Sequence, residues 1–276
     1  MCARAAAGSR WRRAGRLPAA LCAGLTAVVA LAAGPPASAP APECSGPGAG
    51  RRVVLAELFS TDACESCPPA EDVFNRMRVG ADLAPVVWHV DYFDGPAWKD
   101  RFALPAAARR QQALVRAQGL KVVATPQVFV DGLESGDWRD ARALRARLQR
   151  AAGAPEPEGA GSLAIAHVER AGGEAHVDVQ GVAPRAGGGV LLEVVVVQGG
   201  LGSRSTGGEN QGQRLEHEHV VRAASGPRTL PAAGEWSTRI ALPLPPELAG
   251  GAPFGVVAWM QDASARVLDA TWVACP

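Results

Sequence analysis

The feature that most constrains this chain is a pair of cysteines, Cys64 and Cys67, placed between a short apolar run and a helical pattern. The apolar run, 53–59, is followed by Ser-Thr-Asp and predicts a β-strand. Residues 68–77 begin with two prolines, which the first turn of a helix accepts because its N–H groups have no helical partner. Both sulfurs are therefore expected at the carboxyl end of a strand and the N-terminus of a helix, where a thiolate is favoured.

Strand and helix patterns continue to alternate after this pair. Strands are expected at 86–92, 127–130 and 133–135, and helices at 106–118 and 137–152. This order favours parallel strands joined by crossover helices, with an antiparallel edge after the last tight turn. The sequence therefore predicts an α/β domain in this part of the chain.

The pattern changes in the last part of the chain. Residues 151–161 are rich in Gly, Pro and Glu without periodicity, which indicates a linker. Residues 162–276 contain seven short strand-like runs separated by Gly- and Pro-rich turns. We therefore expect an α/β domain over 40–150, followed by a mostly β, sandwich-like domain.

The first 39 residues resemble an export signal. An arginine-rich start precedes an apolar run over 17–33, and Ala37-Ser38-Ala39 fits a signal-peptidase cleavage pattern. The alternative is a membrane anchor, but the run is shorter than about 20 residues and ends at Gly-Pro-Pro. We expect a signal peptide over 1–39 and a periplasmic or secreted mature chain without a membrane span. Disulfides persist in such compartments.

Four of the six cysteines remain after this cleavage, and four allow three pairings. The simplest pairing joins Cys64 to Cys67 and the two chain ends, Cys44 and Cys275, to each other. A zinc site would require a second close pair, which the sequence lacks. We therefore expect a structural Cys44–Cys275 disulfide, and we predict neither a metal nor a cofactor.

Composition narrows the class of partner. Lys and Arg number 28 against 27 Asp and Glu, so the formal net charge is only +1. Nucleic-acid binding requires a basic excess, and aromatic residues at 5% are too few to suggest stacking platforms for single strands. We expect no nucleic-acid partner.

A second motif, Thr125-Pro126, directly precedes the strand expected at 127–130. Together with the cysteine pair, it makes the segment 53–152 resemble the thioredoxin-fold superfamily. The resemblance implies that Pro126 is cis, lies against the sulfurs, and presents the Thr125 backbone to an extended substrate beside Cys64.

Longer motifs resemble the exported family catalogued as domain of unknown function 1223. They cover residues 63–71, 88–94, 98–100, 125–127, 131–132, 210–212 and 219–222. The resemblance spans nearly the whole mature chain. It carries no established substrate, so it bears on fold and compartment more than on function.

From these features we expect a thiol–disulfide oxidoreductase acting on thiols or disulfides of exported proteins. Cys64 comes first and is the expected nucleophile, and Cys67 is the expected resolving partner. Four carboxylates lie nearby in the sequence, and no Lys, Arg or His occurs between residues 59 and 75. Because carboxylates disfavour a thiolate, we expect a site that is not a strong oxidant.

The main alternative is a non-catalytic exported protein, for binding or metal delivery, with an inert Cys64–Cys67 disulfide. His89 and Asp91 alternate along an expected strand and therefore share a face. They form a proton-transfer pair, a pair of metal ligands, or a hydrogen-bonded pair that fixes the following insertion.

His217 and His219 also alternate on an expected strand. Two interpretations stay open for them, a copper site and a solvated strand face.

Overall fold

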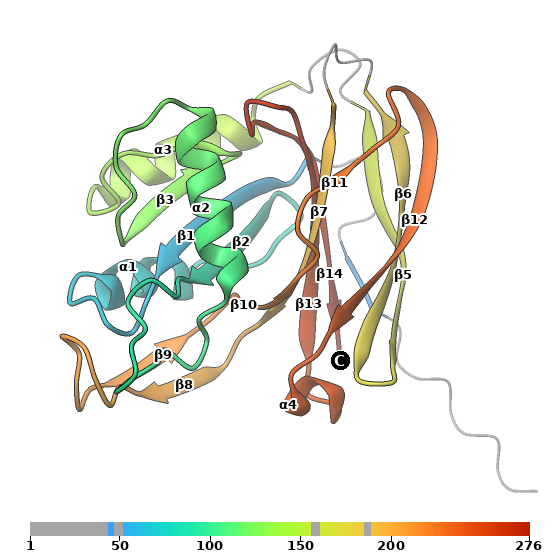
Figure 1. Cartoon of the computed structure of the whole chain (residues 1–276). Coiled ribbons are helices and arrows are strands. Elements are labelled where there is room, and N and C mark those ends of the chain that lie inside the picture. The colour runs from blue at the N-terminus through green and yellow to red at the C-terminus, as the bar shows by residue number, and fades with distance from the viewer. Residues whose placement is uncertain (1–43, 47–51, 156–160, 185–188) are drawn as a thin grey trace, which may run out of the picture. The chain divides into compact units, whose positions relative to one another are not determined.

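The first half of the chain alternates strands and helices, as its apolar pattern predicts. The computed structural model describes residues 44–46, 52–155, 161–184 and 189–276 (Figure 1). Its first elements are β1 (Val54–Ser60), α1 (Cys67–Asn75), β2 (Leu83–His89), α2 (Pro105–Ala117), β3 (Gln127–Val130), β4 (Leu133–Glu134) and α3 (Ala141–Ala152). Every residue of β1 is buried, which explains its continuous apolar run.

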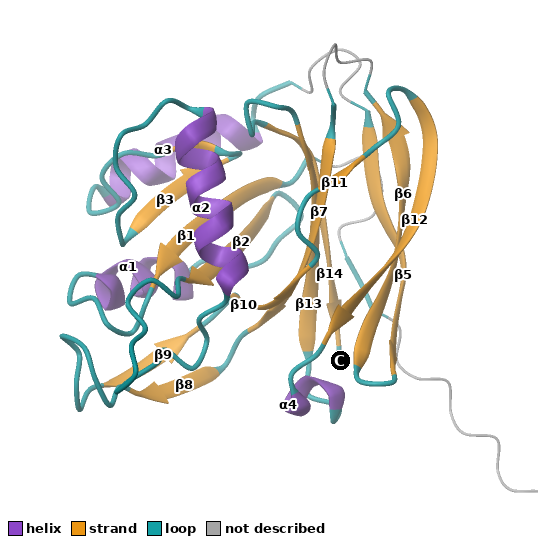
Figure 2. Ribbon diagram, viewed as in Figure 1, coloured by secondary structure: helices purple, strands orange, loops and turns teal. Residues whose placement is uncertain are grey.

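The second half is built almost entirely of strands (Figure 2). They are β5 (Ser162–Ala171), β6 (Glu174–Ala183), β7 (Leu191–Gln198), β8 (Leu201–Arg204), β9 (Arg214–His217), β10 (Val220–Ala224), β11 (Arg228–Thr229), β12 (Gly234–Pro243), β13 (Phe254–Gln261) and β14 (Val267–Cys275). One short helix, α4 (Pro246–Ala249), lies between β12 and β13.

The expected architecture, a thioredoxin-like α/β domain followed by a separate sandwich-like β domain, is wrong. Strands from both halves form one nine-stranded sheet in the order β14-β13-β7-β10-β2-β1-β3-β4, with β11 paired to β7. The halves join where β10 pairs in parallel with β2, at Val220 and Val87. The Val87 N–H donates to the His219 carbonyl at 2.8 Å. Because β10 covers the edge of β2, the α/β elements do not close into a domain of their own.

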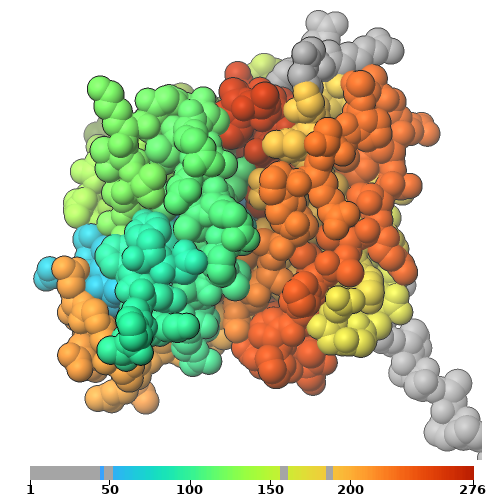
Figure 3. All heavy atoms as spheres, viewed as in Figure 1, coloured from blue at the N-terminus to red at the C-terminus, as the bar shows by residue number. Residues whose placement is uncertain are grey.

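Side chains alternate along the shared sheet and create two faces. In β7, Val194 and Val196 contact a cluster that includes β6 and β12, whereas Val195 and Val197 contact the cluster that includes α2. Helix α2 therefore covers one face, and α1, α3 and the three-stranded sheet β12-β6-β5 cover the other. The space-filling view shows the α2 region in green directly against the red and orange second half (Figure 3).

A buried polar network also crosses between the halves. Arg110 of α2 donates to both carboxylate oxygens of Glu57 at 3.0 and 2.9 Å, and to Glu193 of β7 at 3.1 Å. It also donates to Gln261 of β13 at 2.5 Å. Burial disfavours the charged guanidinium, but the two carboxylates outweigh burial and raise the Arg110 pKa. Arg110 thus neutralises carboxylates from two distant strands.

The predicted disulfide between Cys44 and Cys275 is confirmed, and it spans 231 positions of sequence. Ser45 and Ala274 beside it exchange two backbone hydrogen bonds at 2.8 and 2.7 Å. The segment 1–39, expected to be a signal peptide, lies outside the described residues, as do residues 156–160 of the expected linker. The boundaries placed at 40–150, 151–161 and 162–276 stay predictions. Within the described part, no helix is long and apolar enough to cross a membrane.

Candidate functional site

The cysteine pair lies where β1 gives way to α1. Cys64 is in the turn after β1, and Cys67 is the first residue of α1, where its N–H donates to the Cys64 carbonyl at 3.0 Å. Both thiols are free. Cys64 is 6% exposed and Cys67 is fully buried, so Cys64 is the more accessible sulfur.

The Thr125-Pro126 motif contacts the first of these sulfurs. The Thr125–Pro126 bond is cis, as the resemblance implied. The Cys64 thiol donates to the Thr125 carbonyl oxygen at 3.6 Å and lies 3.3 Å from the Ser66 hydroxyl. The two sequence motifs therefore form one site.

The two thiols have opposite electrostatic environments. A hydrogen bond from Cys67 outweighs burial and, with help from Ser66, lowers the Cys64 pKa to about 6. Burial, followed by the interaction with Cys64, raises the pKa of Cys67. One thiolate shared unequally between two sulfurs is the arrangement that thiol–disulfide exchange uses.

A loop from the second half, between β8 and β9, closes over the cysteine turn. The buried Asn210 amide donates to the carbonyls of Asp62 at 3.0 Å and Cys64 at 2.8 Å. Gly208 has a φ of +69°, and a Cβ atom on it would lie 2.6 Å from the Ala63 Cα. Only glycine permits this approach, so the loop is built to hold the cysteine turn.

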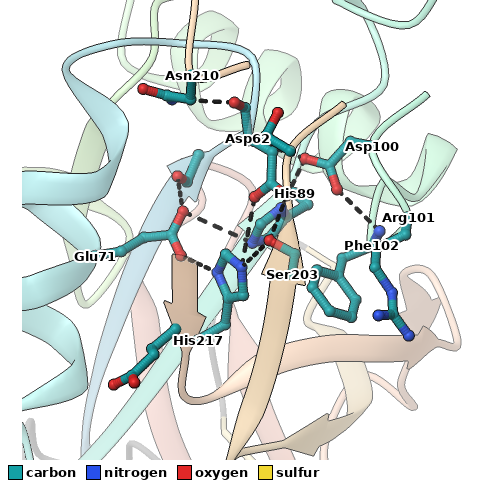
Figure 4. A network of polar contacts seen from close by, with 12 residues as sticks. Asp62, Glu71, His89, Asp100, Arg101, Phe102, Ser203, Asn210 and His217 are labelled. Atoms are coloured by element: carbon teal, nitrogen blue, oxygen red, sulfur yellow. Dashed lines mark hydrogen bonds and ion pairs between the residues drawn. The ribbon is translucent and has the colours of Figure 1, made fainter. Parts of the chain in front are cut away.

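Next to this turn lies a buried polar cluster, drawn in Figure 4. It consists of Asp62 after β1, Glu71 of α1, His89 of β2, Asp100 in the β2–α2 connection, Ser203 of β8 and His217 of β9. Each imidazole Nδ1 faces a carboxylate: His89 pairs with Asp100 at 2.8 Å and His217 with Glu71 at 2.5 Å. Ser203 donates to Asp62 Oδ2 at 2.7 Å and lies 2.9 Å from His217 Nε2.

Burial and neighbouring charges together shift the pKa values of the groups in this cluster. Burial disfavours an imidazolium at His89, but Asp100 and Glu71 outweigh burial and raise the His89 pKa to about 9. Burial, and next the negative charge of Asp100, raise the pKa of Asp62. The buried carboxylates therefore favour the protonated form of His89.

Two histidine expectations need correction. His89 lies in the cluster, but its carboxylate partner is Asp100, and no hydrogen bond joins it to Asp91 among the described residues. His217 and His219 share no strand face, because β9 ends at His217 and His219 turns the chain with a φ of +59°. His217 is buried rather than solvated.

Sequence reasoning missed Glu71, Asp100, Ser203 and Asn210 as members of the site. Two of them come from the second half of the chain. The family-like motif at 210–212 was the one available signal for Asn210. The two buried histidines, from β2 and β9, contact the carboxylates that surround the cysteine turn in the sequence, Asp62 and Glu71.

The fold and site together define a mostly β protein with a free Cys-x-x-Cys pair at a strand–helix junction. The chain belongs to the family described as Protein of unknown function (DUF1223), whose model matches residues 55–261. A comparison with the curated proteins finds no match.

Two solved structures share the fold. Protein AGR_C_4864 from Agrobacterium tumefaciens is 22% identical with a TM-score of 0.54, over 82% of this chain and 96% of that one. HBP35 of Porphyromonas gingivalis is 15% identical with a TM-score of 0.60, over 82% of this chain and 76% of that one. At these identities the likeness concerns the fold alone.

Proposed function

We propose that this protein is a thiol–disulfide oxidoreductase, with Cys64 as the attacking nucleophile and Cys67 as the resolving thiol. The observation that carries the proposal is the asymmetry of the pair. Cys64 is the more exposed sulfur with a pKa near 6, and Cys67 is fully buried with a raised pKa. An inert structural pair needs no such asymmetry.

The reaction proceeds in two exchanges. The Cys64 thiolate attacks one sulfur of a substrate disulfide, and the other substrate sulfur leaves as a thiolate. Cys67 then loses its proton and attacks the Cys64 sulfur, which releases the second substrate thiolate. The substrate gains two electrons and the enzyme pair becomes a disulfide. The reverse sequence oxidises a substrate dithiol.

The surface beside Thr125 supports an extended protein segment as substrate. Exposed apolar side chains lie on two nearby segments: Tyr92 and Phe93, whose rings are 5.1 Å apart, and Val122 and Val123. Tyr92 donates to Gln111, and Gln111 in turn donates to the Ala124 carbonyl at 2.7 Å. This chain of contacts ties the aromatic pair to the Thr125 loop.

The proposal places the protein outside the cytoplasm, in the periplasm or as a secreted protein. The Cys44–Cys275 disulfide supports this, because structural disulfides persist in oxidising compartments. The partners are then the thiols and disulfides of other exported proteins.

A direct test measures exchange between the reduced protein and a small aromatic disulfide that releases a coloured thiolate. We expect two equivalents of coloured thiolate per wild-type protein, one equivalent with Cys67→Ser, which stops at the mixed disulfide, and none with Cys64→Ser. The double variant Cys44→Ser/Cys275→Ser controls for cysteine substitution itself and should also release two equivalents. Equal exchange by the wild type and Cys64→Ser would overturn the proposal and leave the pair a structural role.

A further inference from the structure

We propose that Asp62, His89 and His217 form a binding site for one divalent transition-metal cation of the Zn²⁺ type. The proposal goes beyond the thiol chemistry and uses no property of the cysteine pair. Three observations carry it: the geometry of the three side chains, two buried atoms among them that make no hydrogen bond, and the groups that orient them.

The first observation is the spacing of the three residues. One ligand atom from each lies within 4.8 Å of the other two. Asp62 Oδ1 and His217 Nε2 are 3.5 Å apart. Ligands about 2.0–2.1 Å from a tetrahedral zinc are separated by about 3.3 Å. The carboxylate and imidazole thus already have the separation that a shared cation requires.

The second observation is that two buried atoms make no hydrogen bond within the described structure, Asp62 Oδ1 and His89 Nε2. Their nearest charged neighbours lie beyond hydrogen-bond distance, His217 Nε2 at 3.5 Å from Asp62 Oδ1 and Glu71 Oε1 at 3.7 Å from His89 Nε2. A buried polar atom without a partner costs about 1–3 kcal/mol. Both residues are at most 3% exposed, so bulk solvent does not satisfy these atoms. A cation between them would satisfy both at once.

The third observation is the support behind each imidazole. Asp100 binds His89 Nδ1, and Glu71 binds His217 Nδ1, which leaves both Nε2 atoms directed into the cluster (Figure 4). Metal-binding histidines are commonly held in this way by a carboxylate on the other ring nitrogen, which fixes the tautomer and the ring orientation. Glu71 is itself held by the Ser60 hydroxyl.

Charge and access fit the same assignment. Three buried carboxylates, Asp62, Glu71 and Asp100, surround the two imidazoles, and a divalent cation offsets their charge. A cleft of about 620 Å³ is lined by Glu71, Ser203 and His217 but by neither Asp62 nor His89, so a cation would reach the site past His217. On binding, Ser203 keeps its bond to Asp62 Oδ2 and releases His217 Nε2.

The test is a titration of the purified, metal-free protein with Co²⁺, a coloured substitute for Zn²⁺. We expect one equivalent to bind, with visible d–d bands and without sulfur-to-cobalt charge-transfer bands in the near ultraviolet. One equivalent of Zn²⁺ should displace it. The Cys64→Ser/Cys67→Ser double variant should bind equally well, which separates this site from the cysteine pair.

Variants then assign the ligands. Asp62→Asn and His217→Ala should each weaken binding by at least tenfold, and Glu71→Gln by about 10–100-fold through the orientation of His217. His176→Ala, on the solvent-facing part of β6, is the matched control and should bind like the wild type. Circular dichroism checks that each variant is folded.

X-ray absorption at the zinc edge of the wild type decides the question even if a variant fails to fold. Only nitrogen and oxygen neighbours, with scattering from two imidazoles, would support the proposal. No bound metal, sulfur ligands, or unchanged affinity in folded Asp62→Asn and His217→Ala would overturn it. The exchange assay on Cys64 is independent of every one of these outcomes.

Discussion

The Cys64 sulfur lies 3.6 Å from the carbonyl oxygen of Thr125, 61 positions further along the chain. This contact unites the strand–helix turn with the cis-proline loop. Cys64 thus has the Thr125 carbonyl and the buried thiol of Cys67 as hydrogen-bonding neighbours. The predictions below concern the reactivity of that sulfur and the packing that holds it in place.

Cys64 should react as a thiolate at neutral pH. With a pKa near 6, it should be about 90% ionised at pH 7, against a few per cent for an ordinary cysteine. Its alkylation rate by iodoacetamide, followed by mass spectrometry, should rise through pH 6 and level off above it. Cys67→Ala should move this midpoint upward because it removes the main hydrogen bond, and Cys67→Ser should move it less. A wild-type midpoint near 8.5 would contradict the assignment.

Asn210 should matter for reactivity as well as for stability. Asn210→Ala frees the carbonyls of Asp62 and Cys64 and should slow exchange at Cys64 by about tenfold, or about 1.4 kcal/mol in barrier. Asn75→Ala is the matched control, since Asn75 also joins the two halves, through Glu216 and Glu218. Both variants should lower the urea midpoint, but only Asn210→Ala should lower the rate. Equal rates in the two variants would remove Asn210 from the site.

Arg110 should be a major stabilising residue. Arg110→Met leaves Glu57 and Glu193 buried without their cation and should cost about 3–5 kcal/mol in urea unfolding. Adding Glu57→Gln and Glu193→Gln should recover part of that loss. The neighbouring Arg109 is exposed on α2, so Arg109→Met should change stability by about 0.5 kcal/mol at most. Similar losses for the two arginine variants would show that the network contributes little.

The terminal disulfide should stabilise the chain without taking part in exchange. Cys44→Ser/Cys275→Ser opens a loop of 231 positions and should cost about 2–5 kcal/mol in urea unfolding. Thiolate release in the exchange assay should be unchanged at temperatures where the variant is folded. A loss of that release in the folded variant would link the two cysteine pairs.

Local elements of the first half were predictable because their signals are local. Each signal lies within the element that it predicts or directly before it. These signals are the apolar run of β1, the paired prolines at the start of α1, and Pro126 before β3. The parallel pairing of β10 with β2 has no such signal. It depends on one edge of β2 meeting a strand more than a hundred positions away, and it overturned the expected architecture.

The candidate site also has parts that were predictable from local sequence and parts that depend on long-range contacts. The cysteine pair and the cis-proline were visible as motifs. The acidic surroundings of Cys64 were visible too, but the histidines that meet those acids were not. Glu71 and His217 are 146 positions apart, and they meet only because the β8–β9 hairpin packs on α1. Pairwise contacts of this range leave no periodicity in a single sequence.

The central claim is that Cys64 attacks a substrate disulfide and Cys67 resolves the product. The most direct measurement is to express Cys67→Ser as the full chain in cells, to block free thiols on lysis, and to separate the extract by non-reducing electrophoresis. Our account predicts reducible adducts of higher mass with Cys67→Ser, few or none with Cys64→Ser, and partners identifiable by mass spectrometry. The absence of adducts from both variants, together with a wild-type pair isolated as an unreactive buried disulfide, would contradict it.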